Sequence, residues 1–252
     1  MKDRFFIIGL IVGIGGILLG NSLEGGHFSS LLQFTAFIIV LCGTLGAVLV
    51  THPWEEVRAS IKLLSRAVKK TSESQRQKTS QEIITAAETV KKHSPLQLEK
   101  KINTYSDPFM RDVFRMIVDG VPAEIIEEVF LSEIDVMESK LTRKAKVWTD
   151  AGGFAPTIGI LGAVLGLIHV MSNLSDTSQL GQGIAVAFVA TIYGVASANL
   201  IFLPIGNKIK YEIENIIQNK TMILEAAVFI AKNHPINVIK QQSISYNNEI
   251  GL

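Results

Sequence analysis

The sequence predicts an all-α integral membrane protein with four transmembrane helices and a helical cytoplasmic domain between the second and the third. Three observations support this fold class. Hydrophobic residues make up 48% of the 252 positions, and the mean hydropathy of +0.33 is high for a soluble chain of this size. Four long stretches lack Asp, Glu, Lys and Arg. All 24 Lys and Arg residues lie on one side if each stretch crosses the membrane once.

Each uncharged stretch can cross a hydrocarbon core of about 30 Å as a helix that rises about 1.5 Å per residue. The stretches comprise residues 5–23, 28–50, 151–174 and 179–207. Four apolar segments of this length are improbable as core helices of a soluble protein. The basic start and the apolar run that follows it also suit a signal peptide. Because no convincing small-x-small cleavage site follows, we interpret this segment as a retained first span.

The distribution of cations predicts the orientation of the chain. Lys2 and Arg4 precede the first span, 17 Lys and Arg lie in residues 51–150, and five follow residue 207. The two remaining loops contain none. Because cytoplasmic loops carry the excess of Lys and Arg in membrane proteins, we expect both termini and the large middle segment in the cytoplasm.

Four parts of the chain follow from this topology. They are the first two transmembrane helices (1–50), a cytoplasmic helical domain (51–150), the third and fourth transmembrane helices (151–207) and a cytoplasmic tail (208–252).

Within the cytoplasmic domain, helical patterns alternate with polar breaks. An apolar stripe predicts an amphipathic helix directly after the second span, over residues 54–70. Residues 71–80 are typical of a solvated linker. Shorter helical patterns follow, and a long helix after Pro122 leads directly into the third span.

Charged residues in this domain form two groups. Lys91 and Lys92 end one expected helix, and Glu99, Lys100 and Lys101 lie in the next. Exposed charges contribute little to stability. The two groups therefore fit either a solvated helix face or an electrostatic docking surface.

Small residues recur at helical spacing in the third and fourth spans. They are Ala155, Gly159, Gly162 and Gly166 in the third, and Gly183, Ala187, Thr191, Gly194 and Ala198 in the fourth. Small faces let helix backbones approach closely in lipid. Packing of the two spans against each other explains part of the pattern, but two such faces exceed what one hairpin needs. We therefore expect packing around another polypeptide through Gly159, Gly162, Gly166, Ala187 and Gly194.

Two prolines lie at the cytoplasmic ends of these spans, Pro156 in the third and Pro204 in the fourth. A proline inside a helix removes a backbone hydrogen bond and permits a kink, which membrane helices tolerate when neighbours satisfy the freed groups. Each proline fits either a conformational hinge or a rigid helix end.

The spans contain no carboxylate. Proteins that move protons or cations usually keep an ionisable group within the membrane, and His169, near the outer end of the third span, is a poor candidate because an interfacial role explains it better. A carboxylate on an ion path would have to come from a partner.

Other classes of function lack support in the sequence. One cysteine and five scattered histidines provide no metal or redox motif, so we expect no metal and no cofactor. No P-loop or Gly-rich cofactor motif indicates an enzyme. Nucleic-acid binding is not supported either, because the basic residues of residues 51–150 are interleaved with 16 acidic ones.

The most specific segments are "GGFAPTIGILGAVLGLIHVM" and "GQGIAVAFVATIYGVASANLIFLPIGNKI". Their "AP…G…G…LG" and "TIYG…NLIFLPI" patterns resemble the A subunit of the bacterial flagellar stator, the MotA/PomA family within the MotA/TolQ/ExbB superfamily. The resemblance covers the whole chain. ExbB and TolQ resemble it only from the third span onward and normally have three spans.

The resemblance implies a pentamer of this chain that forms a ring around a dimer of a single-span B subunit of the MotB/PomB type, in the bacterial inner membrane. An aspartate of the B subunit would carry the ion. Ion passage would turn the ring, and the cytoplasmic domains would push the rotor switch protein FliG. Bacterial motility and chemotaxis would depend on this rotation.

The resemblance also implies roles for individual residues. Thr191 matches the hydroxyl residue beside the ion path, and Pro156 and Pro204 occupy the two functional proline positions. The rotor-facing charges of the family lie near Lys91, Lys92 and Glu99, although the spacing differs and Lys100 stands where an acidic residue is common.

Sodium-driven relatives place additional threonines where this sequence has Ala163 and Ala190. Hard oxygen ligands can replace part of a sodium hydration shell, whereas methyl groups cannot. The sequence therefore predicts proton coupling. Two alternatives stay open: an ExbB/TolQ-like energiser of an envelope system that uses the proton-motive force, and a sodium-driven stator of the PomA type.

Overall fold

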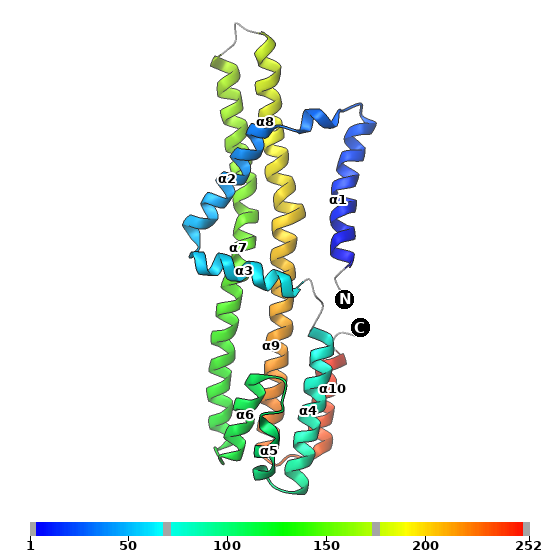
Figure 1. The fold of residues 1–252 in the computed structure, drawn as a ribbon, viewed down its shortest axis with the longest axis vertical. Coiled ribbons are helices and arrows are strands. Elements are labelled where there is room, and N and C mark those ends of the chain that lie inside the picture. Colours follow the sequence, from blue (N-terminus) through cyan, green and yellow to red (C-terminus); the bar gives the residue numbers. More distant parts are fainter. Residues whose placement is uncertain (1–3, 68–71, 173–176, 249–252) are drawn as a thin grey trace. The chain divides into compact units, whose positions relative to one another are not determined.

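The computed structural model describes residues 4–67, 72–172 and 177–248, and the regular elements within these ranges are all helices (Figure 1). The α-helices are α1 (Arg4–Leu23), α2 (Phe34–Thr51), α3 (Trp54–Ala67), α4 (Ser72–Lys92), α5 (Glu99–Ile102), α6 (Pro108–Val118), α7 (Ala123–Ser172), α8 (Thr177–Ser197), α9 (Leu203–Ala231) and α10 (Ile236–Asn248). Two 3₁₀ segments, η1 (Phe28–Leu31) and η2 (Pro95–Leu98), and one π-helical turn, η3 (Ala198–Phe202), complete the chain. The predicted all-helical fold is confirmed.

Four of these helical segments are long and apolar enough to cross a membrane. They are Phe5–Leu23, Phe28–Thr51, Ala123–Ser172 and Gly183–Ala231. Each contains one of the four predicted spans or most of it. The third and fourth segments extend well beyond the apolar stretches, because polar helical turns continue the same helices.

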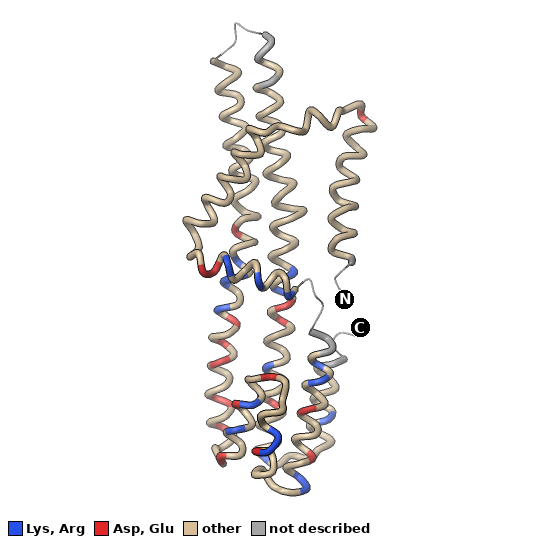
Figure 2. The backbone as a smooth tube through the Cα atoms, in the orientation of Figure 1, with Lys and Arg blue, Asp and Glu red and all other residues tan. Residues whose placement is uncertain are grey.

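Contacts divide the chain into two compact units. The first comprises residues 1–69 and 143–210, and the second comprises residues 70–142 and 211–252. The first unit thus holds the uncharged stretches of these four segments together with α3. The charged positions coloured in Figure 2 are concentrated in the second unit and in α3.

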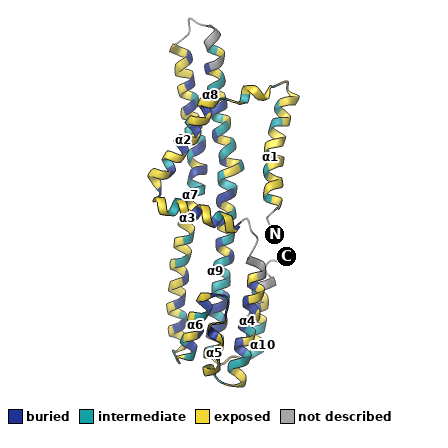
Figure 3. Cartoon of the chain, viewed as in Figure 1, coloured by how far each residue is buried: buried dark blue, intermediate teal, exposed yellow. Residues whose placement is uncertain are grey.

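In the first unit, α2 packs along α8. Ala36 and Val40 of α2 are buried against Val189 and Ala190 of α8. The Tyr193 hydroxyl donates a hydrogen bond to the Leu31 carbonyl at 2.5 Å, which fastens α8 to the turn before α2. By contrast, α1 is largely exposed within the single chain (Figure 3).

In the second unit, apolar side chains of α4, α5, α6, α9, α10 and the start of α7 share one core. Met110 and Phe114 of α6 and Ile126 of α7 are fully buried there, as is Met222 of α9. Phe109 and Phe130 pack edge to face with ring centroids 5.3 Å apart. The chain therefore buries the apolar face at the start of α7 by itself.

The predicted linker over residues 71–80 is wrong, because α4 begins at Ser72. Arg76, inside that segment, is only 3% exposed. Its guanidinium donates hydrogen bonds to the Asn215 and Gln218 side-chain oxygens, both at 3.1 Å, and to the Tyr246 carbonyl at 3.1 Å. A buried cation requires such acceptors, and they come from α9 and α10, which the local sequence around Arg76 does not reveal.

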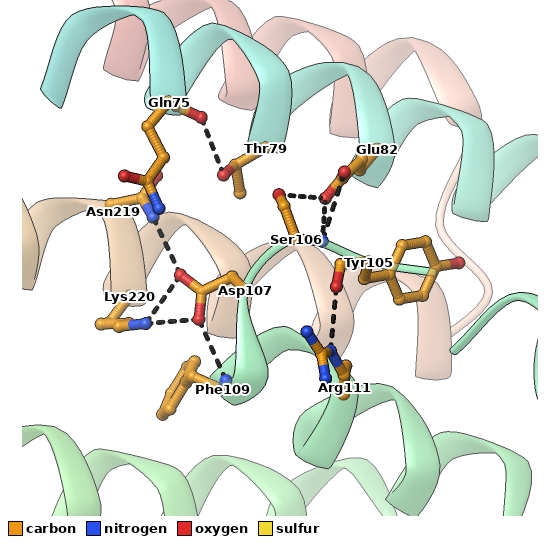
Figure 4. Close-up of polar contacts among 10 residues, drawn as sticks. All are labelled: Gln75, Thr79, Glu82, Tyr105, Ser106, Asp107, Phe109, Arg111, Asn219 and Lys220. Atoms are coloured by element: carbon orange, nitrogen blue, oxygen red, sulfur yellow. Dashed lines mark hydrogen bonds and ion pairs between the residues drawn. The ribbon is translucent and has the colours of Figure 1, made fainter. Parts of the chain in front are cut away.

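A buried ion pair joins α6 to α9 in the second unit (Figure 4). Lys220 Nζ lies 2.5 and 2.7 Å from the two Asp107 carboxylate oxygens. Asp107 also caps α6, because its carboxylate accepts a hydrogen bond from the Phe109 amide at 3.0 Å. The Asp107 charge thus has both a counter-ion and a helix N-terminus to compensate the cost of its burial.

Near this ion pair, the Glu82 carboxylate binds Ser106, and its charge acts on Tyr105 (Figure 4). The Glu82 carboxylate accepts hydrogen bonds from the Ser106 amide at 3.2 Å and the Ser106 hydroxyl at 3.0 Å. Burial, with a further contribution from the Glu82 charge, raises the pKa of Tyr105 to about 12. Tyr105 is therefore neutral at physiological pH.

Candidate functional site

The candidate ion path is the hairpin of α7 and α8, in which two small faces meet. An added Cβ on Gly159 would lie 2.9 Å from the Ala190 carbonyl oxygen, and one on Gly194 would lie 2.5 Å from the Ala155 carbonyl oxygen. These distances leave no room for a side chain, so the two backbones are in direct contact. Such close approach is characteristic of helices that associate in lipid.

The same contact continues along the hairpin. An added Cβ on Gly162 would lie 2.8 Å from the Ala190 methyl group, and one on Gly166 would lie 3.0 Å from the Ala187 methyl group. Gly159, Gly162, Gly166, Ala187 and Gly194 therefore face the other helix of the same chain. The sequence predicted that these residues pack around a partner, whereas in the structure they pack within the hairpin. The small face of α7 lies directly against the small face of α8.

The three residues expected along the ion path have different environments. Ala190 is completely buried, between Gly162 of α7 and the α2 side of the hairpin, so its methyl group does not reach an open surface. Thr191 and Ala163 are partly exposed. The Thr191 hydroxyl donates a hydrogen bond to the Ala187 carbonyl at 3.3 Å, which leaves its oxygen lone pairs available as acceptors. Thr191 is the one of the three that can offer oxygen to an ion or to a carboxylic acid.

Pro156 lies within α7, and Pro204 lies in the first turn of α9. Pro156 is inside α7, where it deprives the Gly152 carbonyl of its helical hydrogen bond. A Cβ added to Gly152 would lie 2.6 Å from the Leu203 side chain, next to Pro204. The start of α9, beside Pro204, therefore packs against α7 one turn before Pro156.

The fourth span changes its helical geometry immediately before Pro204. Residues 198–202 form the π-helical turn η3, and α9 continues from Leu203. π-turns inside α-helices are rare and occur frequently at functional sites. The proline at 204 and the polar Asn199 within the apolar run were the available sequence signals, but the predictions did not include the π-turn.

The predicted rotor-facing charges lie at one end of the second unit. Lys91 Nζ donates a hydrogen bond to Asn233 Oδ1 at 2.8 Å. Asn233 has a positive φ of 58° just after the end of α9, where such a residue commonly closes a helix. Lys91 thus interacts with the C-terminus of α9 while remaining exposed, and Lys92 and Glu99 are exposed nearby in α4 and α5.

An ion pair adjoins this charged end. Lys240 Nζ of α10 lies 2.9 Å from the Glu88 carboxylate of α4. The hydrogen bond and charge of Lys240, with a smaller contribution from Lys92, lower the pKa of Glu88. Among the residues that the structure describes, no cluster of His, Cys, Asp and Glu has the arrangement of a metal site.

Comparison with known proteins identifies the family. The family described as the MotA/TolQ/ExbB proton channel family matches residues 101–222, which include the α7–α8 hairpin, and the one described as Motility protein A N-terminal matches residues 7–93. Motility protein A of Bacillus subtilis is 31% identical over 248 residues, which cover 97% of this chain and 90% of that protein. The chain belongs to the Motility protein A family.

Further relatives agree with this family. Motility protein A of Helicobacter pylori is 30% identical over 97% of this chain and 95% of its own length. The structure of C. jejuni MotAB superposes with a TM-score of 0.89 at 26% identity, covering 97% of this chain and 95% of that one. The flagellar MotAB stator complex from Bacillus subtilis superposes with a TM-score of 0.84 at 30% identity, covering 93% and 92%.

As a member of this family, the chain is a membrane subunit of the flagellar stator and belongs to a proton channel family. The match over residues 7–93 also decides between two predicted functions. An ExbB- or TolQ-like energiser would resemble the chain only from the third span onward, whereas the first two spans here match Motility protein A. The flagellar function is therefore confirmed over that alternative.

Proposed function

We propose that this stator subunit conducts protons together with a B subunit that supplies the membrane carboxylate. The observation that carries the proposal is the hairpin of α7 and α8, whose apolar stretches contain no Asp, Glu, Lys or Arg while Thr191 is partly exposed beside the helix contact. A proton path across a membrane requires an ionisable group. The two structural relatives are MotAB complexes, which supports a B-type partner as its source.

The proposed assembly is a homopentamer around a B-subunit dimer in the bacterial inner membrane, with both termini of this chain in the cytoplasm. The location of all Lys and Arg residues on one side of the four spans supports this orientation. Packing around the B subunit would use the outward surfaces of α7 and α8, because the glycine face is occupied within the hairpin. Exposed apolar side chains on those surfaces include Leu161, Val164, Phe188 and Val195.

Proton coupling, rather than sodium coupling, is supported by the chemistry of positions 163 and 190. Both residues are alanines, and Ala190 is buried within the chain. Sodium favours several hard oxygen ligands, of which Thr191 offers one. A proton needs only the partner carboxylate and a water or hydroxyl that exchanges hydrogen bonds with it.

The proposed rotor contact is the charged end of the second unit, formed by Lys91, Lys92 and Glu99, which would engage the switch protein FliG. Exposed charges on a docking surface mainly set partner choice and association rate. Pro156 and Pro204 would transmit the change in the membrane to this domain. The packing of Leu203, next to Pro204, against Gly152, one turn before Pro156, supports a coupled hinge.

Proton flux in liposomes tests the proposal. We would reconstitute the chain with its B subunit carrying either the native membrane aspartate or asparagine, and also without a B subunit. Flux that requires the aspartate and is independent of sodium at a fixed proton-motive force is the expected result. Flux from this chain alone, or flux that follows sodium, would contradict the proposal.

Two threonine variants refine the test. Thr191→Ala should reduce proton flux several-fold while the complex still assembles, because only the hydroxyl beside the path is lost. Thr51→Ala is the matched control, since the Thr51 hydroxyl also bonds to its own helix, donating to the Ala47 carbonyl at 2.7 Å, but lies in α2. Equal effects of both substitutions would remove the special role of Thr191.

A further inference from the structure

We propose that α3 is a binding site for anionic phospholipid headgroups at the membrane surface, through Arg58, Lys62 and Arg66 together with Trp54. No part of the stator function requires this interaction, so the proposal stands independently of the ion-path assignment. It concerns a helix whose exposed side combines cations with large apolar side chains.

α3 follows the second apolar segment almost directly. The apolar segment that contains α2 ends at Thr51, and α3 begins at Trp54, with only His52 and Pro53 between them. Figure 1 shows α3 running crosswise to the helices of its own unit. A helix that leaves a membrane span with no intervening loop and turns across it lies at the level of the lipid headgroups.

One face of α3 packs inside the protein. Ser60, Leu63 and Ala67 are buried and lie on one side of the helix. Polar contacts to α7 hold this orientation at the start of α3. Arg143 Nε lies 3.5 Å from a Glu56 carboxylate oxygen, and His52 Nε2 lies 3.0 Å from an Asp150 carboxylate oxygen. The same His52 ring lies 3.7 Å from Glu56 through Nδ1, so the α2–α3 elbow is joined to α7.

The face of α3 opposite its buried side carries cations and a tryptophan. Trp54, Arg58, Lys62 and Arg66 follow one another at intervals of four residues, which places them along one side of a helix. Arg58, Lys62 and Arg66 are exposed, and no ion pair involves them within the described parts of the chain. Figure 2 shows the row of basic residues on α3. Successive side chains at this spacing are about 5–6 Å apart at Cβ, close enough to hold one phosphate or two neighbouring headgroups.

Exposed apolar side chains beside these cations favour a membrane over an acidic protein as the ligand. Trp54 is 62% exposed and Ile61 is 55% exposed. Tryptophan and basic residues on one helix beside an apolar edge are typical of helices that lie in the interface, with the indole at headgroup level. Glu55 is the exposed acidic residue at the start of this face, and the Glu56 charge is compensated by Arg143.

Quenching of Trp54 fluorescence by brominated lipids tests the proposal in the full chain, purified with its B subunit and reconstituted in nanodiscs. The difference between the native protein and Trp54→Phe isolates the Trp54 signal from that of Trp148 and of the partner. Brominated phosphatidylglycerol should quench this signal with at least about fivefold preference over brominated phosphatidylcholine, the factor that one Lys or Arg near an anionic surface contributes.

The variant Arg58→Gln/Lys62→Gln/Arg66→Gln should bring the preference close to one. The matched control Lys78→Gln/Lys100→Gln/Lys140→Gln removes the same charge from exposed positions of the second unit and should leave the preference unchanged. In the native protein the preference should also fall as salt is raised, which tests the electrostatic contribution without any substitution at the cations.

Equal quenching by the two lipids in the native protein would overturn the proposal, as would a preference that persists in high salt. No quenching by either lipid would place Trp54 away from the bilayer and would favour a protein partner instead.

Discussion

Gly194→Ala perturbs the closest contact of the α7–α8 hairpin. The added methyl group would lie 2.5 Å from the Ala155 carbonyl oxygen and 3.0 Å from the Gly159 Cα. Both neighbours are backbone atoms, which cannot rotate away as a side chain could. The two helices must therefore separate, or slide, until the contact reaches an ordinary van der Waals distance.

The expected cost follows from two opposing effects. Overpacking of a well-packed contact costs about 1–3 kcal/mol, and a 2.5 Å contact with backbone atoms belongs to the upper part of this range, about 2–3 kcal/mol. Alanine in place of glycine favours a helix by about 1 kcal/mol. The net destabilisation is then roughly 1–2 kcal/mol. For a chain of this size, that corresponds to a melting temperature lowered by about 2–8 °C.

Thermal unfolding of the purified complex measures this effect. Gly181→Ala is the matched control, because Gly181 lies on the same helix and an added Cβ there would meet no atom within 4 Å. The control should be unchanged or slightly more stable. If Gly194→Ala melted at or above the temperature of the native complex, the close approach of α7 and α8 would not be what holds the hairpin.

Three further predictions concern the second unit. Asp107→Asn retains the helix cap but leaves Lys220 without its counter-ion, so the free energy of unfolding of this unit should fall by about 3 kcal/mol. Hydrogen exchange in α6 and α9 measures this change. The control Asp112→Asn, at an exposed ion pair, should change the free energy of unfolding by less than about 1 kcal/mol. Tyr105→Phe should reduce the loss of stability between pH 10 and 12. The raised pKa of Tyr105 adds stability to the folded state that is fully present below the unfolded pKa near 10 and is lost as pH rises toward about 12. Equal curves of stability against alkaline pH for both proteins would contradict this. Charge reversal of Lys91 and Lys92 should weaken rotor engagement, measured as fewer stators recruited to the motor, with proton flux in liposomes unchanged; lost flux would indicate misfolding instead.

Apolar length and charge placement made the four spans predictable. A span of about 20 apolar residues must be helical in lipid, since its backbone groups have no other hydrogen-bond partners there. The family was recognisable because the spacing of glycine, proline and threonine in the last two spans is specific. These features are local, and a local pattern can be read without knowing the packing.

Partners of individual side chains were not predictable in the same way. The polar segment around Arg76 suited a linker as well as a helix, and only acceptors more than 130 residues away make it a buried element. The roles of Lys91 and Ala190 also depend on distant residues. Lys91 interacts with the end of α9, and Ala190 is enclosed by α7 and α2.

The sequence by itself determined the number of membrane spans, their separation by a charged segment and the family, because hydrophobicity, charge and helix periodicity act on each segment independently. Only the tertiary structure decided which surface each small or polar residue faces. Gly159 and Gly194 could have met a partner equally well by spacing alone, but their added Cβ atoms would collide within the hairpin. Close packing between helices decides which way a residue on a helix faces. This packing depends on the positions of atoms from both helices at once.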